Sequence, residues 1–208
     1  MSRFFSADFH LGGSVLLNKK IVKGAVRPFD NPEDMQNYLL NECNSRMKET
    51  DVLIHIGDFA SYGKERGIEQ NRIDPFEYIK QIKAKVILLE GNHDRNNRVN
   101  CDFKSLFTVL GPYHFVTAGH FPSWYSEAFK TYRKFGIHLC GHVHGEWKWR
   151  FDETNGVLNI NCGIDVWKYH IVKESKLIGY IGNVIKQIKN EKFKSETTKT
   201  FLEYLNQQ

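Results

Sequence analysis

The chain has 208 residues, of which 41% are hydrophobic and 25% are charged, so it can form one globular domain with a substantial apolar core. No apolar run reaches the length needed to span a bilayer, and we therefore expect no membrane partner. The net charge of +5 and the isoelectric point of about 8.9 suit an anionic substrate, but they are too modest to indicate nucleic-acid binding by themselves.

Four cysteines are spread along the chain without any C-x-x-C pair, which argues against a zinc ribbon and against a dithiol redox motif. They are Cys43, Cys101, Cys140 and Cys162. Because the first residues lead directly into a charged motif, we expect no signal peptide. The expected location is therefore the cytoplasm, with the thiols reduced and mostly packed as small apolar groups.

Apolar runs alternate with amphipathic stretches along the chain. The predicted buried strands cover residues 3–7, 52–56, 86–89, 115–118 and 137–140. Two helix starts fall between these runs, at Asn31-Pro32 and at Asp74-Pro75, where a capping side chain precedes a proline in the first turn. This alternation of strands and helices favours a layered α/β fold.

Both predicted helices carry an apolar face at helical spacing, which predicts the side that each buries. The first face consists of Met35, Tyr38, Leu39, Cys43 and Met47, and the second of Phe76, Ile79 and Ile82. Later in the chain, the pattern changes. Residues 146–151 alternate loosely, and the hairpin dipeptide Asn155-Gly156 then leads into residues 157–160, which predicts an antiparallel pair that closes the sheet.

The composition shifts again after residue 172, where apolar residues recur on one helical face. These residues are Leu177, Ile181, Val184 and Ile188. We therefore divide the chain into a main domain over residues 1–172 and a helical C-terminal appendage over residues 173–208.

Five short motifs end hydrophobic runs with polar side chains that can bind metal ions. They are Asp8-Phe9-His10, Gly57-Asp58, Gly91-Asn92-His93-Asp94, Gly119-His120 and Gly141-His142-Val143-His144. Each motif follows a predicted strand, and ligands in α/β sheets bind beyond the carboxyl ends of the strands. We therefore expect these side chains to meet at one rim of the sheet, with the glycines at 57, 91, 119 and 141 allowing sharp turns and close backbone approach.

The side chains in these motifs are typical of a centre that holds two metal ions. Carboxylate oxygen and imidazole nitrogen suit Mn²⁺, iron and Zn²⁺, and the absence of cysteine argues against a purely structural zinc site. Two such ions at about 3.5–4 Å repel each other, so they need a shared anionic ligand and a bridging hydroxide. Asp58 is the candidate for the shared ligand. Asn92 adds an oxygen without adding negative charge, which leaves the centre positive enough to attract a phosphate.

The order of these motifs resembles that of the calcineurin-like metallophosphoesterases, over roughly residues 1 to 172. The resemblance implies an α/β layered fold with a central mixed β-sandwich flanked by helices. It implies two divalent metal ions, with manganese expected and iron, zinc, nickel or magnesium as alternatives. One ion would be held by Asp8, His10, Asp58 and His144, and the other by Asp58, Asn92, His120 and His142.

A narrower resemblance is to a subgroup of small bacterial and phage phosphoesterases. It rests on Arg27-Pro28-Phe29, the following helix with Asn44, residues 51–59 and the stretch 161–167. The resemblance ends at about Lys173, which leaves the appendage unassigned.

The resemblance also assigns roles around the metal ions. His93 would face the substrate, as general acid or transition-state stabiliser, and Asp94 would orient it. Asn92, His93 and Arg95 are the candidates for substrate binding, although Arg95 could equally form a surface salt bridge. The expected reaction is in-line attack of the metal-bridging hydroxide on phosphorus, without a covalent intermediate.

These observations predict a dinuclear metallophosphoesterase that hydrolyses a small phosphate ester, with a phosphodiester, in particular of a nucleotide, favoured over a monoester. A nuclease or nucleic-acid end-processing enzyme is the alternative. It is suggested by the basic net charge and by the aromatic and basic stretch 147–150, but we favour a plain strand for that stretch. The basic stretch 129–134 could be a rim near the pocket or a solvated helix end. A non-catalytic interaction scaffold is less favoured, because no ligand position is lost. We interpret His55, His114, His138, His170 and Asp165 as structural.

Overall fold

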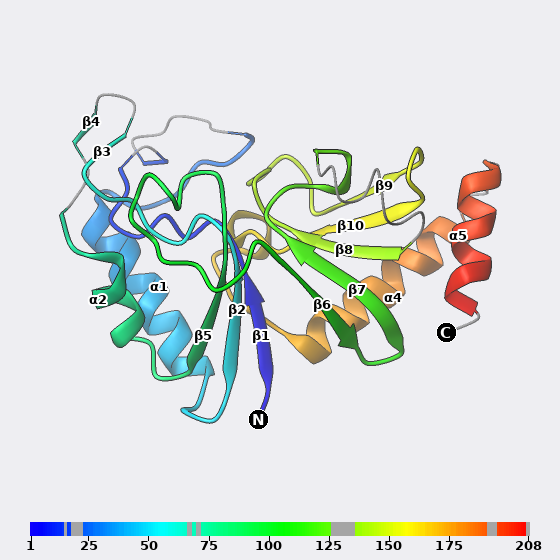
Figure 1. The fold of residues 1–208 in the computed structure, drawn as a ribbon, viewed down its shortest axis with the longest axis horizontal. Coiled ribbons are helices and arrows are strands. Elements are labelled where there is room, and N and C mark those ends of the chain that lie inside the picture. Colours follow the sequence, from blue (N-terminus) through cyan, green and yellow to red (C-terminus); the bar gives the residue numbers. More distant parts are fainter. Residues whose placement is uncertain are drawn as a thin grey trace.

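The computed structural model describes residues 1–14, 16–17, 23–65, 68–69, 72–125, 136–190 and 195–206. The basic stretch 129–134 lies outside the described residues. Two mixed β-sheets form the centre of the molecule, and helices flank them (Figure 1). The expected class, a layered α/β fold with a central pair of mixed sheets, is confirmed.

The first sheet has four strands in the order β11-β1-β2-β5. They are β1 (Arg3–Ser6), β2 (Val52–Ile56), β5 (Lys85–Leu89) and β11 (Val172–Lys173). The three long strands are parallel, and β11 pairs with β1 in the antiparallel direction. Because both faces of this sheet are covered, its strands are continuous apolar runs, which is why the sequence pattern located them so closely.

The second sheet has five strands in the order β6-β7-β8-β10-β9. They are β6 (Ser105–Leu110), β7 (Tyr113–Gly119), β8 (Gly136–Cys140), β9 (Trp149–Asp152) and β10 (Val157–Asn161). The predicted hairpin between β9 and β10 is antiparallel, whereas β7, β8 and β10 run parallel to one another. The sequence analysis missed β6, an edge strand whose side chains alternate between exposed and partly buried. Two short strands, β3 (Lys64–Glu65) and β4 (Ile68–Glu69), pair in the antiparallel direction.

The helices are α1 (Pro32–Arg46), α2 (Pro75–Lys80), α4 (Glu174–Asn190) and α5 (Glu196–Asn206), with 3₁₀ turns η1 (Ser123–Tyr125) and η2 (Ile164–Trp167). Both predicted helix starts are confirmed. The side chain of Asn31 accepts a hydrogen bond from the backbone N–H of Asp34 at 2.8 Å, and Asp74 accepts one from Phe76 at 2.9 Å.

The predicted buried face of α1 is largely correct, whereas that of α2 is wrong at its first residue. Phe76 is 57% exposed and lies beneath the ammonium group of Lys80. Tyr78 is buried in its place, and its hydroxyl donates a hydrogen bond to Gln36 on α1. Because α2 has only six residues, one contact with α1 is enough to set which side it buries.

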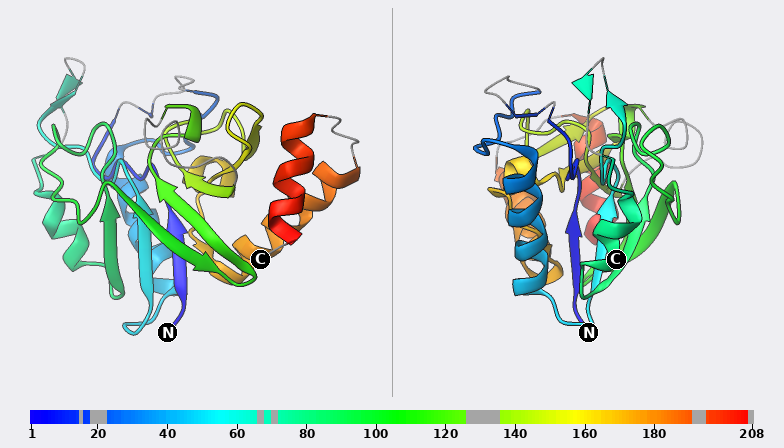
Figure 2. Two further views of the ribbon diagram at one scale, coloured as in Figure 1. Left: turned by 45° about the vertical axis from the view of Figure 1, so that its right-hand side comes forward. Right: turned by 90° about the vertical axis from the view of Figure 1, so that its left-hand side faces the viewer.

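Two hydrophobic clusters divide the interior, and the alternation of side chains along β1 and β2 decides their membership. Phe5 and Ile54 point into the larger cluster, which contains residues of both sheets and of α4. Phe4 and Leu53 point the other way, toward α1 and α2. Figure 2 shows α1 on one side of the first sheet.

The C-terminal segment is helical, as expected, and its apolar face is buried. Leu177, Ile181 and Ile188 of α4 and Phe201 of α5 belong to the larger cluster. These helices therefore pack on the same core as the two sheets, while the division at residue 172 stays a prediction. Among the described residues, no helix is long and apolar enough to cross a membrane.

Candidate metal centre

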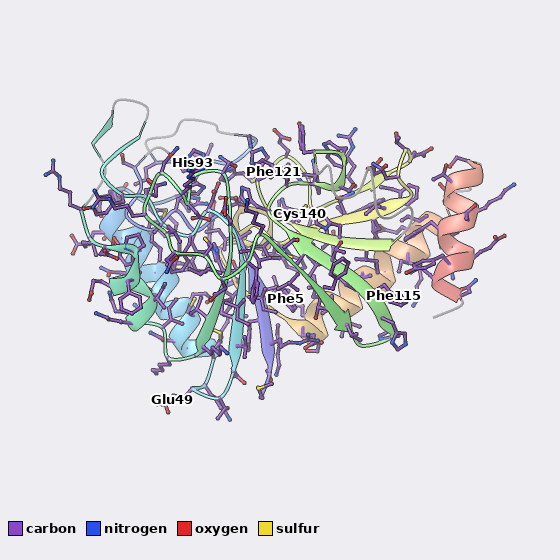
Figure 3. The ribbon with its side chains drawn as sticks, in the orientation of Figure 1. Phe5, Glu49, His93, Phe115, Phe121 and Cys140 are labelled. Atoms are coloured by element: carbon purple, nitrogen blue, oxygen red, sulfur yellow. The ribbon has the colours of Figure 1, made fainter. Side chains whose placement is uncertain are left out.

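All five motifs lie at the carboxyl ends of parallel strands. Those of the first sheet follow β1, β2 and β5, and those of the second follow β7 and β8. Figure 3 shows His93 and Phe121 in the loops above these strand ends, with Glu49 at the opposite end of the first sheet. The seven predicted metal ligands come together there, and Asp8, His10, Asp58, His120 and His144 are all at least nine-tenths buried.

Two groups of side chains each place three metal-binding atoms within 4.8 Å of one another. One group is Asp8, His10 and His144, and the other is Asp8, Asp58 and His120. A carboxylate oxygen of Asp58 lies 3.2 Å from Nε2 of His120 and 3.6 Å from Nε2 of His10, so it stands between the two groups. Asp8 belongs to both groups, whereas the sequence analysis expected only Asp58 to be shared.

Asn92 connects the remaining predicted ligands to this cluster. Its Oδ1 lies 3.0 Å from Nε2 of His120 and 2.8 Å from Nδ1 of His142. The backbone N–H of His142 in turn donates to a carboxylate oxygen of Asp8 at 3.0 Å. Residues that are 134 positions apart in the sequence are thus joined by a direct hydrogen bond.

The backbone conformation at these positions is unusual. Five of the predicted ligands are in the left-handed region, with φ values of 59° at Asp8, 50° at His10, 57° at Asp58, 71° at His142 and 46° at His144. Side chains other than glycine rarely adopt this conformation, and where they do, the site is often functional. The chain turns sharply as it leaves β1, β2 and β8, and these turns direct the ligands toward a common point.

Three of the four predicted glycines are required by close packing at the centre. A Cβ atom at Gly57, where φ is 84°, would lie 2.5 Å from Nδ1 of His120, and one at Gly91 would overlap the carboxylate of Asp58. A Cβ atom at Gly141 would lie 2.8 Å from Oδ2 of Asp8. The expected close approach is therefore confirmed at these three positions. It is wrong for Gly119, where an added Cβ would make only ordinary contacts, the nearest at 3.6 Å.

Two histidines are oriented by hydrogen bonds on the ring nitrogen that faces away from the cluster. Nδ1 of His120 lies 2.9 Å from the carbonyl oxygen of Ile56, and Nδ1 of His144 lies 2.9 Å from Oδ2 of Asp165. In each case Nδ1–H donates to an oxygen, and Nε2 is the ring nitrogen that faces the cluster. Partners of this kind fix the tautomer and orientation of metal-binding histidines.

Asp165 contacts the predicted ligand His144, although the sequence analysis interpreted it as structural. It follows β10, which lies parallel to β8, so the strand-end rule applied to the other ligands would have selected it. Asp165 also pairs with the buried Arg27, whose Nε lies 3.0 Å from its Oδ1. Arg27 donates further hydrogen bonds to the carbonyl oxygens of Asp8 and Phe9. It therefore supports the β1 loop from inside and does not face a substrate.

The electrostatics of this pair favour the charged carboxylate. Burial acts to raise the pKa of Asp165, but the charge of Arg27 and the hydrogen bond from His144 outweigh it, so the pKa lies well below its usual range. An ionised Asp165 accepts the Nδ1–H of His144 and thereby fixes the orientation of the ring.

We expect Asp165→Asn to reduce metal affinity by about 10- to 100-fold, because an amide holds the His144 ring less firmly and supplies no charge. Calorimetric titration with Mn²⁺ measures this change. The matched control is Glu42→Gln, which breaks another carboxylate–histidine contact, to His170 at 3.0 Å, away from the predicted ligands. Equal metal affinity in both variants would contradict an orienting role for Asp165.

The surroundings of one buried ring nitrogen, Nε2 of His10, indicate whether this cluster suits metal ions. Nε2 of His10 is shielded from solvent and has no hydrogen-bond partner among the residues that the structure describes. Burial lowers the pKa of His10 well below its ordinary value, which keeps its imidazole neutral. A buried polar atom left unpaired is costly, and a coordinated cation would satisfy it. The carboxylate, amide and imidazole donors together suit divalent ions.

The residues around Asn92 form the outer part of the centre. The backbone N–H of His93 donates to Oδ1 of Asp58 at 2.9 Å, and the His93 ring lies 5.5 Å from that of His10. The carboxylate of Asp94 accepts hydrogen bonds from the backbone N–H groups of residues 58, 59 and 91, so it holds the Asp58 loop against the Gly91 loop. Arg95 is exposed beside them.

Burial and the charge of Asp58 raise the pKa of Asp94 to about 6. Burial also acts to raise the pKa of Asp58, but the hydrogen bond and charge of His120 outweigh it and hold that pKa well below its usual range. Asp58 is thus ionised near neutral pH, as a carboxylate must be to bind a metal ion.

Comparison with known proteins agrees with this geometry. The model of the calcineurin-like phosphoesterase family matches residues 4–146, which is more than half of the chain and includes all seven predicted ligands. The chain belongs to the calcineurin-like phosphoesterase family.

Individual relatives are distant. The uncharacterized protein MJ1445 of Methanocaldococcus jannaschii is 23% identical over 173 residues, which cover 81% of this chain and 88% of that protein. The crystal structure of AQ665, a protein of unknown function from Aquifex aeolicus, is 17% identical and aligns with a TM-score of 0.58 over 86% of this chain and 98% of that one. The nuclease MPE of Pseudomonas putida is 23% identical and aligns with a TM-score of 0.35 over 68% of this chain and 60% of that one.

Proposed function

We propose that this protein is a dinuclear metal-dependent phosphoesterase whose favoured substrate is a phosphodiester. The observation that carries the proposal is the meeting of two buried three-ligand groups around Asp8, with the unpaired Nε2 of His10 among them. Membership of the phosphoesterase family supports it. A role as a non-catalytic scaffold is less well supported, because every predicted ligand position is present in the cluster.

The ligand assignment stays as predicted, with Asp8, His10, Asp58 and His144 for one ion and Asp58, Asn92, His120 and His142 for the other. We propose manganese, with iron, zinc, nickel and magnesium as alternatives. When bound, the two ions would supply a hydroxide nucleophile at neutral pH and positive charge for the phosphate oxygens.

Within this centre, side chains of the protein would orient the substrate and donate a proton to the leaving oxygen. His93 lies at the edge of the ligand cluster with a half-buried ring, a position that supports donation of a proton to the leaving oxygen. Asn92 and the exposed Arg95 would bind phosphate oxygens on the open side. The hydrogen bonds of Asp94 support a positioning role through the Asp58 and Gly91 loops, while its predicted orientation of His93 stays a prediction.

The proposed partner is a small phosphate ester, with a nucleotide favoured over a nucleic acid, and the proposed location is the cytoplasm. The four cysteines are free thiols, which supports a reducing compartment. The aromatic side chains Trp124 and Trp147, which lie against each other near Arg150, favour nucleic-acid processing as the second candidate.

A substrate panel with each of the five metals tests the proposal. We expect Mn²⁺-loaded protein to hydrolyse bis(p-nitrophenyl) phosphate faster than p-nitrophenyl phosphate, and removal of the ion with a chelator to abolish both activities. Cyclic nucleotides and oligonucleotides complete the panel. Absence of turnover on every phosphate ester, in protein shown to bind two ions per chain, would refute the proposed function.

A further inference from the structure

A row of aromatic side chains begins at the candidate metal centre and follows the loop after β7. The rings of Phe121 and Tyr125 lie 4.7 and 6.1 Å from the ring of His142. Trp124 continues the row, 6.1 Å from Tyr125 and 5.6 Å from Trp147. We call Phe121, Trp124 and Tyr125 the aromatic shelf.

The aromatic shelf is partly open to solvent. Tyr125 is 62% exposed and Phe121 is 38% exposed, although both rings contact a predicted ligand. Figure 3 shows Phe121 above the carboxyl end of β7, among the loops that carry the centre. A flat ring attached to a phosphate at the centre would therefore meet the exposed rings of the shelf.

Buried polar side chains hold the shelf in place from inside. The backbone N–H of Ser123 donates to Oδ1 of Asn159 at 2.8 Å, and its hydroxyl donates to Oδ2 of Asp152 at 2.7 Å. Nε2 of the buried His138 lies 2.9 Å from the carbonyl oxygen of Phe121. His138 is thus structural, as predicted.

Buried polar groups destabilise a fold unless they are hydrogen-bonded, and here their bonds converge on one short exposed segment. That segment, residues 121–125, is therefore held in one conformation before any ligand binds. Ordering of the rings would add little to the cost of binding, which is the usual advantage of a preorganised site.

A positive charge lies at the far end of the shelf. The guanidinium carbon of the exposed Arg150 is 5.0 Å from the centroid of the Trp124 ring. The shelf thus offers aromatic faces next to the metal centre and a cation beyond them, which suits a ligand that is both planar and anionic.

We propose that the aromatic shelf stacks on a nucleobase while the attached phosphate lies at the metal centre, so that the substrates are phosphodiesters of nucleotides. This inference rests on the proposed function and specifies its substrate class. All bases have a π face, so stacking on Tyr125 and Phe121 selects for a base without selecting which one.

Calorimetric binding of AMP and of ribose 5-phosphate to the metal-loaded protein tests this inference, because the two ligands differ in the base. We expect AMP to bind at least about tenfold more tightly than ribose 5-phosphate, as one stacked base predicts. Tyr125→Ala should weaken AMP binding by about tenfold and leave ribose 5-phosphate binding within about twofold, whereas Tyr125→Phe should keep the preference for AMP. Phe76→Ala, which removes an exposed ring on α2, is the matched control and should change neither affinity.

Equal affinity of the unaltered protein for both ligands, or an equal loss of both in Tyr125→Ala, would overturn the inference. Hydrolysis of bis(p-nitrophenyl) phosphate, measured on the same preparations, separates this failure from failure of the proposed function. If the protein hydrolyses that ester but shows no preference for AMP, the stacking of a nucleobase on the shelf is refuted and the proposed function is not. Tyr125 is the better position to change, because Phe121 directly follows the predicted ligand His120.

Discussion

Asp58→Asn is expected to lower turnover by about 10³-fold or more and to weaken binding of at least one metal ion. One carboxylate oxygen of Asp58 accepts the backbone N–H of His93, and the other lies near both His10 and His120. The substitution keeps the size of the side chain but removes one of the two predicted anionic ligands. Metals contribute several kcal/mol of transition-state stabilisation, and each 1.36 kcal/mol corresponds to a tenfold change in rate.

Metal content by elemental analysis and turnover of a generic phosphodiester are the two measurements for Asp58→Asn. Asp74→Asn is the matched control, because it makes the same chemical change at the exposed N-cap of α2, where asparagine caps equally well. The shared-ligand assignment is wrong if Asp58→Asn binds two ions with the affinity of the unaltered protein.

His93→Asn is expected to reduce turnover by about 10²- to 10⁴-fold while two metal ions stay bound, because general acid catalysis contributes rate enhancements of that size. Its ring stands beside the ring of His10, and its backbone N–H, which donates to Asp58, is kept in the variant. Loss of the ring should therefore affect the proton transfer and leave the ligand cluster in place.

The separation of turnover from metal content identifies the role of His93. His114→Asn serves as the control, because His114 is exposed near the start of β7, at the other end of the strand from His120. A good leaving group such as p-nitrophenolate needs less help from an acid, so the loss should be smaller with that ester than with an alkyl ester. Unchanged turnover in His93→Asn, or loss of a metal ion, would contradict the general-acid role.

Much of the fold could be predicted because the relevant signals are local. The strands of the first sheet are buried on both faces, so each is a short apolar run, and β2 begins and ends at the predicted residues, Val52 and Ile56. The starts of α1 and α2 were visible because a capping side chain and a proline act within one turn. Edge strand β6 was missed because half of its side chains face solvent.

The candidate ligands could also be predicted, because each follows the end of a strand within one to four residues of sequence and brings a recognisable side chain. The residues that support these ligands could not be predicted. Asp165 and Arg27 are 138 residues apart, and no local pattern indicates that the two meet behind His144. The aromatic shelf depends in the same way on Asn159 of β10, which lies 36 residues from Ser123.

The amino-acid sequence by itself therefore determined the type of fold, the family and the set of side chains able to bind metal ions, because periodicity, capping and motif order are properties of neighbouring residues. Only the tertiary structure decided which carboxylate supports which histidine, that Asp8 belongs to both ligand groups, and that aromatic rings border the centre. The physical reason is that these contacts arise where β1, β8 and β10 end side by side, and strand order and register set those distances.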